Sequence, residues 1–295
     1  MLVVLGNACR DVTFRVAALP EPGETLSALE TVSGLGGKGL NQAVAAARTG
    51  AAVRLVAAIG NDPAAGSIRA ALRTENMTDQ GLIEKPGDTD LSAIIVGSSG
   101  ENVIVTNSTQ AAGLSINDIA EHVRLESDDV LLLQGNLSAE TSSYAVRSAK
   151  ASGARVVFNP APFQAWCKSL AQDVDVLILN SVELERWFGA GGQGMPVAEL
   201  EMPLAIVTRG PRGCLMKCGR KPAELFAAPL VKTEDATGAG DVFAGVFAAS
   251  WGKSGDAAAA VRLALAAASD SVTRLGAFAS IPSREALARM QRELA

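Results

Sequence analysis

Several residue types that mark common classes of protein are scarce in this sequence. Its 295 residues include one histidine, one tyrosine and four cysteines. The single histidine, His122, lies in a segment, residues 116–124, that we expect to form a surface helix. This argues against a histidine-based catalytic triad or zinc centre. The cysteines are scattered without a paired framework, and we interpret them as reduced thiols packed inside the fold.

Basic clusters and long apolar runs are also missing. The formal net charge is −5, which argues against binding to nucleic acid or to an anionic membrane surface. The N-terminus lacks the pattern of a secretion signal, and no apolar run is long enough to span a bilayer. We therefore expect a soluble, cytoplasmic protein that acts on a small molecule.

Short apolar runs recur along the chain and predict an α/β fold with a doubly wound, mostly parallel sheet flanked by helices. These runs are residues 2–5, 53–59, 130–133, 155–158, 176–179 and 204–207. Helices are expected over residues 43–48, 64–73, 256–273 and 283–294. Ligands of such sheets bind at the carboxyl ends of the strands, and polar or loop-forming residues follow nearly every run.

More polar, β-capable segments predict a second, smaller sheet. Residues 12–33 are punctuated by proline and glycine, which favours exposed strands. Residues 91–96 and 103–105, joined by the turn residues 98–102, are typical of a hairpin. These segments together are expected to lie outside the main core.

The heptapeptide Asp235–Asp241, with the sequence Asp-Ala-Thr-Gly-Ala-Gly-Asp, carries the clearest chemical signal. Its small residues let the backbone bend sharply, and the helix-forming segment 242–249 that follows directs free N–H groups back at the turn. This predicts an anion cradle. A carboxylate beside a bound anion needs a chemical reason, and Asp241 acting as the base for an attacking hydroxyl supplies one. The alternative is an ordinary glycine-rich turn capped by aspartate.

A second glycine-rich segment, residues 34–42, precedes the helix expected over 43–48. Its glycine spacing formally fits a dinucleotide fingerprint, but no buried strand directly precedes it, which makes an NAD-dependent enzyme improbable. A Walker A loop also fails, because Gly39 rather than Ser or Thr follows Lys38. What remains is a loop that brings Lys38 and Asn41 close to a polar group.

The segments Gly36–Ala43 and Asp235–Asp241 resemble the two signature segments of the ribokinase-like (PfkB) carbohydrate kinases. The resemblance extends over essentially the whole chain, and the further stretches that carry it, in the right order, are residues 22–25, 100–104, 159–162, 180–183 and 272–277. It implies an ATP-dependent sugar kinase that uses Mg²⁺ and phosphorylates a hydroxymethyl group. It also implies a large α/β domain and a small β lid that usually forms a homodimer interface. The large domain would comprise residues 1–11, 34–88 and 107–295, and the lid residues 12–33 and 89–106.

The resemblance assigns roles to residues of both signature segments. Asp241 resembles the catalytic base, and the turn that receives developing charge on the phosphoryl group comprises Gly238, Ala239, Gly240 and the N–H of Asp241. The sugar-binding positions are Asp11, Gly37, Lys38, Asn41 and Asn136. The nucleotide-binding positions are Asn180, Thr208 and Gly210, together with Gly238 and Gly240.

Two cation sites are implied as well. Glu183 would act on Mg²⁺, through water because this ion keeps part of its hydration shell. Asp235, Thr237, Gly276 and Ser280 fall where the family places a K⁺-type activating site. Taken singly, these residues have simpler readings: Lys38 as a solvated loop residue, Glu183 as an exposed helix residue and Asn180 as a plain N-cap.

Departures from the family pattern bear on the substrate. Cys9 stands where ribokinases have Asn, and Asn136 where they have Glu. Each unmatched hydroxyl costs about 1–3 kcal/mol, enough to change the preference among sugars, so ribose is one candidate of several. A nucleoside kinase remains an alternative, although it would use aromatic side chains around a base. A non-catalytic sugar-binding regulator is a third reading, against which the intact Asp241 turn argues.

Overall fold

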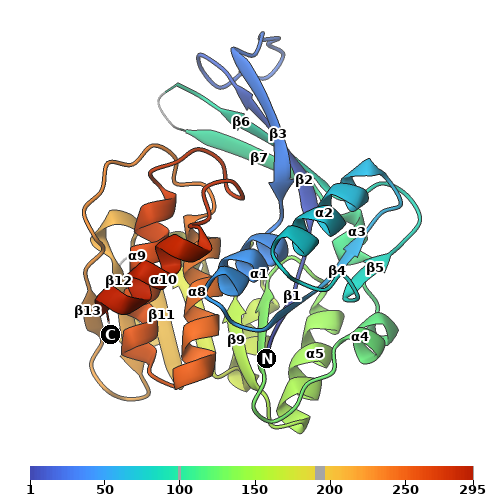
Figure 1. The fold of residues 1–295 in the computed structure, drawn as a ribbon. Coiled ribbons are helices and arrows are strands. Elements are labelled where there is room, and N and C mark those ends of the chain that lie inside the picture. The colour runs from blue at the N-terminus through green and yellow to red at the C-terminus, as the bar shows by residue number, and fades with distance from the viewer. Residues whose placement is uncertain (99–100, 190–196, 295) are drawn as a thin grey trace.

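The computed structural model describes residues 1–98, 101–189 and 197–294. Its main sheet has the strand order β13-β12-β11-β10-β9-β8-β1-β4-β5 (Figure 1). The strands are β1 (Leu2–Leu5), β4 (Val53–Ile59), β5 (Leu82–Glu84), β8 (Val130–Gln134), β9 (Arg155–Asn159), β10 (Val176–Asn180), β11 (Leu204–Thr208), β12 (Cys214–Cys218) and β13 (Glu224–Phe226). All neighbours from β5 to β11 pair in parallel, and β12 and β13 are antiparallel, which confirms the predicted sheet.

Alternation along the buried strands divides the core into two layers. On β1, Leu2 and Val4 face one layer, whereas Val3 and Leu5 face the other. The first layer contains α1 (Lys38–Arg48), α2 (Pro63–Thr74), α8 (Ala239–Ser254), α9 (Ala257–Ser271) and α10 (Arg284–Leu294). The second contains α3 (Thr109–Ala112), α4 (Ile116–His122), α5 (Ala139–Ala151), α6 (Cys167–Leu170) and α7 (Ser181–Phe188). Helices therefore cover both faces, as a doubly wound sheet requires.

Strand β1 marks the switch point of the sheet. The chain runs outward from β1 to β4 and β5, and later returns to the other side of β1 to begin β8. The segments that follow β1 and β8 therefore diverge, and a crevice opens between them at the carboxyl ends of the strands. Figure 1 shows the small sheet rising above this end of the molecule.

Helix α1 begins at Lys38, so the expectation of a helix starting at Ala43 was wrong. The glycine content of this segment favoured a loop, but Gly37, with φ of 98°, makes the turn and Gly39 already lies inside the helix. A side chain at position 39 would place a Cβ 2.7 Å from the backbone of Asn7. Glycine is present because the helix starts against the end of β1, and its first turn consequently belongs to the crevice.

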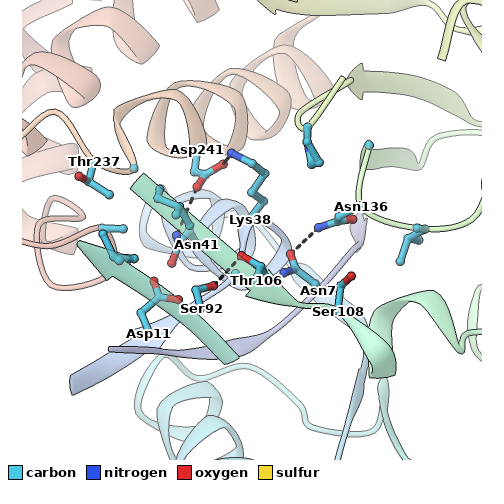
Figure 2. A pocket seen from close by; sticks show the side chains of 18 of the residues that line it. Asn7, Asp11, Lys38, Asn41, Ser92, Thr106, Ser108, Asn136, Thr237 and Asp241 are labelled. Atoms are coloured by element: carbon cyan, nitrogen blue, oxygen red, sulfur yellow. Dashed lines mark hydrogen bonds and ion pairs between the residues drawn. The ribbon is translucent and has the colours of Figure 1, made fainter. Parts of the chain in front are cut away.

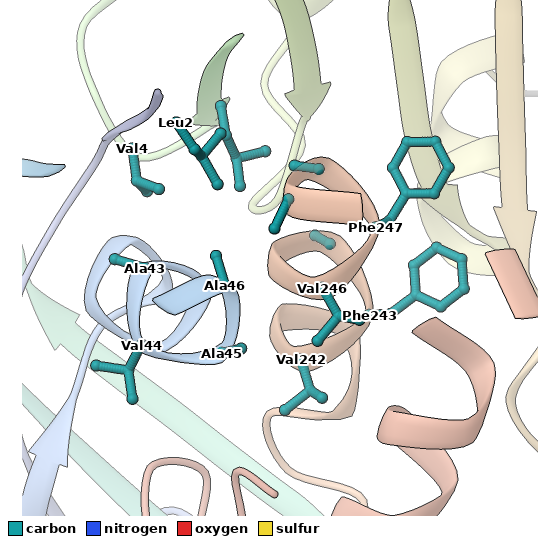
Figure 3. Packing of buried hydrophobic residues seen from close by; sticks show 14 of the residues in the cluster. Leu2, Val4, Ala43, Val44, Ala45, Ala46, Val242, Phe243, Val246 and Phe247 are labelled. Carbon is teal, nitrogen blue, oxygen red and sulfur yellow. The ribbon is translucent and has the colours of Figure 1, made fainter. Parts of the chain in front are cut away.

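Helices α1 and α8 pack unusually closely. A Cβ at Gly245 would lie 2.2 Å from the carbonyl oxygen of Gln42, so only glycine allows this approach. Figure 3 shows Ala45 of α1 directed toward α8, whereas Phe243 and Phe247 of α8 point away from α1 toward the rest of the core. The close contact brings the start of α1 beside the start of α8.

The second sheet has the order β3-β2-β6-β7. Its strands are β2 (Cys9–Arg15), β3 (Glu30–Gly36), β6 (Leu91–Val96) and β7 (Asn102–Asn107). The antiparallel pairing of β6 with β7 confirms the predicted hairpin, of which turn residues 99 and 100 lie outside the described residues. Pairing of β2 with β3 extends from Cys9–Gly36 to Arg15–Glu30, so this sheet reaches down to the crevice. Within the described parts of the chain, no helix is long and apolar enough to cross a membrane.

Candidate active site

A pocket of about 710 Å³ lies between the two sheets, in the volume range of small-molecule sites. Its floor comes from the residues that follow β1 and β8 and from the first turns of α1 and α8, and its roof from β2, β6 and β7 (Figure 2). The predicted site residues that line it are Asp11, Gly37, Lys38, Asn41, Asn136, Asp235, Thr237, Gly238 and Asp241. Residues separated by more than 200 positions in the chain thus share one cavity.

Asp241 lies at the bottom of this pocket, in the first turn of α8. Gly238 forms the turn before it with φ of 81°, and Asp241 is only 6% exposed. The Nδ2 of Asn41 donates to Oδ2 at 3.3 Å, and the Nε2 of Gln42 donates to Oδ1 at 3.1 Å. Lys38 approaches Oδ1 with its Nζ at 3.8 Å, so it is a helix residue paired with the carboxylate and not the solvated loop residue of the simpler reading.

A smaller recess of about 60 Å³ adjoins the pocket. Asn180, Glu183, Thr208 and Gly240 line it, and Lys38 and Asp241 line both cavities. A Cβ at Gly240 would meet nothing within 4 Å, so the start of α8 is open on this side. The buried carboxylate of Asp241 and the Lys38 amine therefore stand at the boundary between two cavities.

The turn before α8 already uses part of its hydrogen-bonding capacity. The N–H of Ala239 donates to the carbonyl of Ala236 at 3.3 Å, and the N–H of Asp241 donates to the carbonyl of Gly238 at 2.9 Å. Both are short-range bonds of the tight turn. Two predicted site residues, Ala239 and Gly210, line neither cavity. Gly210 is exposed at the start of a short 3₁₀ turn after β11.

Asn180 and Glu183 form a capping box at the start of α7. The Asn180 side chain accepts a hydrogen bond from the Glu183 N–H at 2.8 Å, and Oε2 of Glu183 accepts one from the Asn180 N–H at 2.8 Å. Asn180 is thus an N-cap, as the simpler reading held. Glu183 is 7% exposed, so its reading as an exposed helix residue was wrong, and burial raises the pKa of its carboxyl group.

The roof of the pocket carries a chain of polar side chains around Asp11. The Cys9 thiol donates to Oδ1 of Asp11 at 3.3 Å and lies 3.5 Å from the Ser92 hydroxyl. Thr106 in turn donates to Ser92 at 3.1 Å. Burial, with a smaller contribution from the charge of Asp241, raises the pKa of the Asp11 carboxyl group, although the bonds from Cys9 and Ser92 oppose this.

Two amides meet at the switch point itself. The Nδ2 of Asn136, after β8, donates to Oδ1 of Asn7, after β1. The Oδ1 atoms of Asn136 and Asn41 are buried and have no hydrogen-bond partner among the described residues. Both residues line the pocket, so two buried acceptors beside it have no protein donor among the described residues.

The residues expected at a monovalent cation site lie in two loops, one that precedes α8 and one that follows α9. Asp235 accepts from the N–H groups of Thr237 and Gly276, each at 2.9 Å. Burial raises the pKa of this carboxyl, but these hydrogen bonds outweigh it and the net shift is downward. Ser280 is fully buried, and its carbonyl accepts from Arg274 at 2.8 Å. No cluster of three or more His, Cys, Asp or Glu side chains suited to a metal occurs in the part of the chain that the structure describes.

Sequence reasoning assigned no individual role to several polar residues of the site, although it expected the residues that follow the strands, Asn7, Gln134 and Asn159 among them, to form the binding rim. Gln42, Gln134 and Asn159 are buried and connect to Asp241, while Asn7, Ser92 and Thr106 lie along the pocket. A signal was available for the strand residues, since Gln134 and Asn159 are the first polar positions after apolar runs. For Ser92 and Thr106 the sequence offers only alternation in the hairpin, which does not say which face meets the pocket.

Comparison with known proteins gives consistent results. A family model described as pfkB family carbohydrate kinase matches residues 1–284. Ribokinase of Haemophilus influenzae is 32% identical over 294 residues, covering 96% of each chain. Deoxyribokinase of Salmonella typhi is 32% identical over 305 residues, again covering 96% of each. The structure of Arabidopsis thaliana ribokinase complexed with ribose and ATP has a TM-score of 0.84 and 25% identity, covering 99% of this chain and 98% of that chain.

The fold is that of the small-molecule phosphotransferases with the ribokinase architecture. The chain belongs to the pfkB family of carbohydrate kinases. It is accordingly a kinase whose acceptor is a sugar hydroxyl, as the two glycine-rich signature segments predicted.

Proposed function

We propose that this protein transfers the γ-phosphoryl group of ATP to the hydroxymethyl group of a sugar, with Asp241 as the general base. The observation that carries the proposal is the position of Asp241, buried at the boundary between a sugar-sized pocket and a recess at the start of α8. A base in this place reaches a hydroxyl in the pocket while the phosphoryl group lies on the side of the recess.

The proposed reaction is a direct transfer of the phosphoryl group from one substrate to the other. The acceptor oxygen forms a bond to the γ-phosphorus, the bond from that phosphorus to the bridging oxygen breaks, and ADP leaves. The hydroxyl proton passes to the Asp241 carboxylate. Lys38 and the open N-terminus of α8 at Gly240 are placed to stabilise negative charge on the transferring group.

The pocket favours a small polyol. Asp11 offers a carboxylate, and Asn41 and Asn136 add polar amides to the lining, groups with which sugar hydroxyls form hydrogen bonds. The names of the relatives make ribose and deoxyribose the first candidates. A nucleoside is less favoured because, among the described residues, Trp166 is the one aromatic side chain in the lining of this pocket.

The residues of the recess fit a hydrated Mg²⁺ ion. Glu183 and Asn180 supply oxygen atoms, the donor type that Mg²⁺ prefers, but the capping box already engages both side chains, which favours contact through water. Mg²⁺ bound there with ATP would neutralise phosphate charge. We also propose that Asp235, Thr237, Gly276 and Ser280 hold K⁺, since they offer oxygen atoms in one loop cluster. The bond from Arg274 to the Ser280 carbonyl weakens that one ligand.

The outer face of the small sheet supports a homodimer. Phe14, Leu91, Val103 and Val105 alternate with the pocket-facing positions of their strands, and they are 36%, 40%, 47% and 67% exposed. Such a patch suits burial against a second copy. Light scattering on the purified protein would measure the mass, and Val105→Glu should yield a monomer. A wild-type protein that is monomeric at micromolar concentration would contradict this part. A cytoplasmic location stays a prediction.

The function is tested by measuring ADP release from Mg-ATP over a panel of pentoses, hexoses and nucleosides, with K⁺ or Na⁺ as the monovalent ion. We expect turnover on a pentose that falls by at least about 100-fold in Asp241→Asn, the usual size of a general-base contribution. A sugar that raises the thermal midpoint of unfolding without any ADP release would instead support a non-catalytic regulator.

A further inference from the structure

A chain of buried amides leads from the centre of the sheet to Asp241. Gln42 is fully buried, and its Nε2 donates both to Oδ1 of Asp241 and to Oδ1 of Asn159, each at 3.1 Å. Gln134 on β8 donates to Oε1 of Gln42 at 2.9 Å. Asn159, at the end of β9, donates to the carbonyl of Ile178 on β10 at 3.0 Å. Neither Gln42 nor Gln134 lines the pocket or the recess.

One group that can only accept hydrogen bonds, the carbonyl of Ile178, fixes the direction of this chain. The Ile178 carbonyl requires the amide nitrogen of Asn159 to face it, which turns the Asn159 oxygen toward Gln42. Gln42 must then present its nitrogen to Asn159 and to Asp241, and its oxygen to Gln134. Reversing any one amide would bring two donors or two acceptors together in a buried place, which is costly.

The backbone of Gln42 is held as firmly as its side chain. The carbonyl oxygen of Gln42 lies against Gly245 of α8, where a Cβ would come within 2.2 Å. A shift of α1 along α8 would therefore produce a clash. The Gln42 side-chain amide is held in turn by its three hydrogen-bond partners, Asn159, Asp241 and Gln134.

We propose that Gln42 is a positioning residue that donates to Oδ1 of Asp241 and so fixes the orientation of the base before the sugar binds. The amide chain prevents the Gln42 amide from turning round, so its N–H stays directed at Oδ1. The inference rests on the proposed kinase function and adds a role for a residue that does not touch the substrate.

Other charged groups face Asp241 from the elements around it. Lys38 on α1 lies 3.8 Å from Oδ1, and the carboxylates of Asp11 on β2 and Glu183 on α7 are close enough to interact with its charge. All three remain in place when Gln42 is replaced. Their contributions to the pH profile are therefore common to the wild type and the variants.

The test is the pH dependence of kcat at saturating sugar and ATP in Gln42→Met and Gln42→Leu. Each variant removes the N–H donor, so the rise of kcat with pH should move upward by about one pH unit, while KM for the sugar stays within about twofold. Gln110→Met is the matched control, because Gln110 is another buried glutamine, whose side chain donates to the carbonyls of Pro86 and Asp88 in the segment before β6 and has no hydrogen bond to Asp241. Its pH profile should coincide with that of the wild type.

A second measurement does not depend on turnover. Gln42→Met and Asp241→Asn should each change the thermal midpoint of unfolding. The shift of the double variant should differ from the sum of the two single shifts, because the two side chains share a hydrogen bond. Coinciding pH profiles, or additive midpoint shifts, would overturn the role of Gln42. If the wild type turns over no sugar, the proposed function fails, and the double variant still decides whether the two side chains are coupled.

Discussion

The Cys9 thiol and the Asp11 carboxylate are joined by a hydrogen bond of 3.3 Å in the roof of the pocket. Burial, together with the neighbouring charge of Asp11, raises the pKa of the Cys9 thiol, so it remains a protonated donor at neutral pH. A weak donor thus orients the carboxylate that we propose to bind the sugar. This places the departure of Cys9 from the family pattern directly beside a substrate-binding residue.

Replacing Cys9 tests that relationship. Cys9→Ala removes the donor and should raise KM for the sugar by about fivefold, the value of one hydrogen bond, with kcat nearly unchanged. Cys9→Ser keeps a donor and should stay within about twofold of the wild type. Steady-state kinetics on the best sugar measures both. Equal KM values for the alanine and serine variants would show that the thiol does not orient Asp11.

The raised pKa of Asp11 has a consequence for stability. In the folded protein its carboxyl binds a proton more tightly than in the unfolded chain, so the ionised form costs stability at neutral pH and this cost disappears as the pH falls below the ordinary value of 3.8. Asp11→Asn should therefore raise the thermal midpoint at pH 7, with a gain that shrinks toward pH 4, and should weaken sugar binding. A midpoint that falls at pH 7 would contradict the argument.

Glu183→Gln examines the proposed Mg²⁺ site. The amide preserves the length of the side chain and can still accept from the Asn180 N–H, but the charge is lost. The Mg²⁺ concentration that gives half-maximal velocity should rise by about tenfold, the size expected for an outer-sphere contact. Glu185→Gln is the control, because Glu185 lies on the same helix and is exposed. An unchanged Mg²⁺ dependence in Glu183→Gln would remove Glu183 from the site.

Gly245→Ala tests how closely α1 and α8 must pack. A methyl group 2.2 Å from the Gln42 carbonyl forces the helices apart, which should lower the free energy of unfolding by about 1–3 kcal/mol and reduce turnover. Gly66→Ala, on α2 with open space around its Cβ position, should instead stabilise by about 0.5–1 kcal/mol. Chemical denaturation gives both values. If Gly245→Ala were as stable as the wild type, the close packing would not limit the site.

Much of the fold could be predicted because its signals are local. The helix expected over residues 64–73 lies within α2, which Asp62 caps by accepting from the Ala65 N–H at 2.9 Å. The buried strands were visible as apolar runs. The start of α1 was not, because Gly37 and Gly39 resemble loop residues unless the approach of Asn7 is known.

The candidate site likewise combines features that depend on local sequence with features that depend on long-range packing. The glycine-rich turn before α8, the carboxylate of Asp241 at that helix start and the N-cap Asn180 could be predicted, because each depends on neighbours a few residues away. The contacts of Gln42 with Asp241, 199 positions later, and of Asn7 with Asn136 could not be predicted. Those contacts depend on the order of strands at the switch point and on the packing of α1 against α8, which long-range burial sets and no local pattern records.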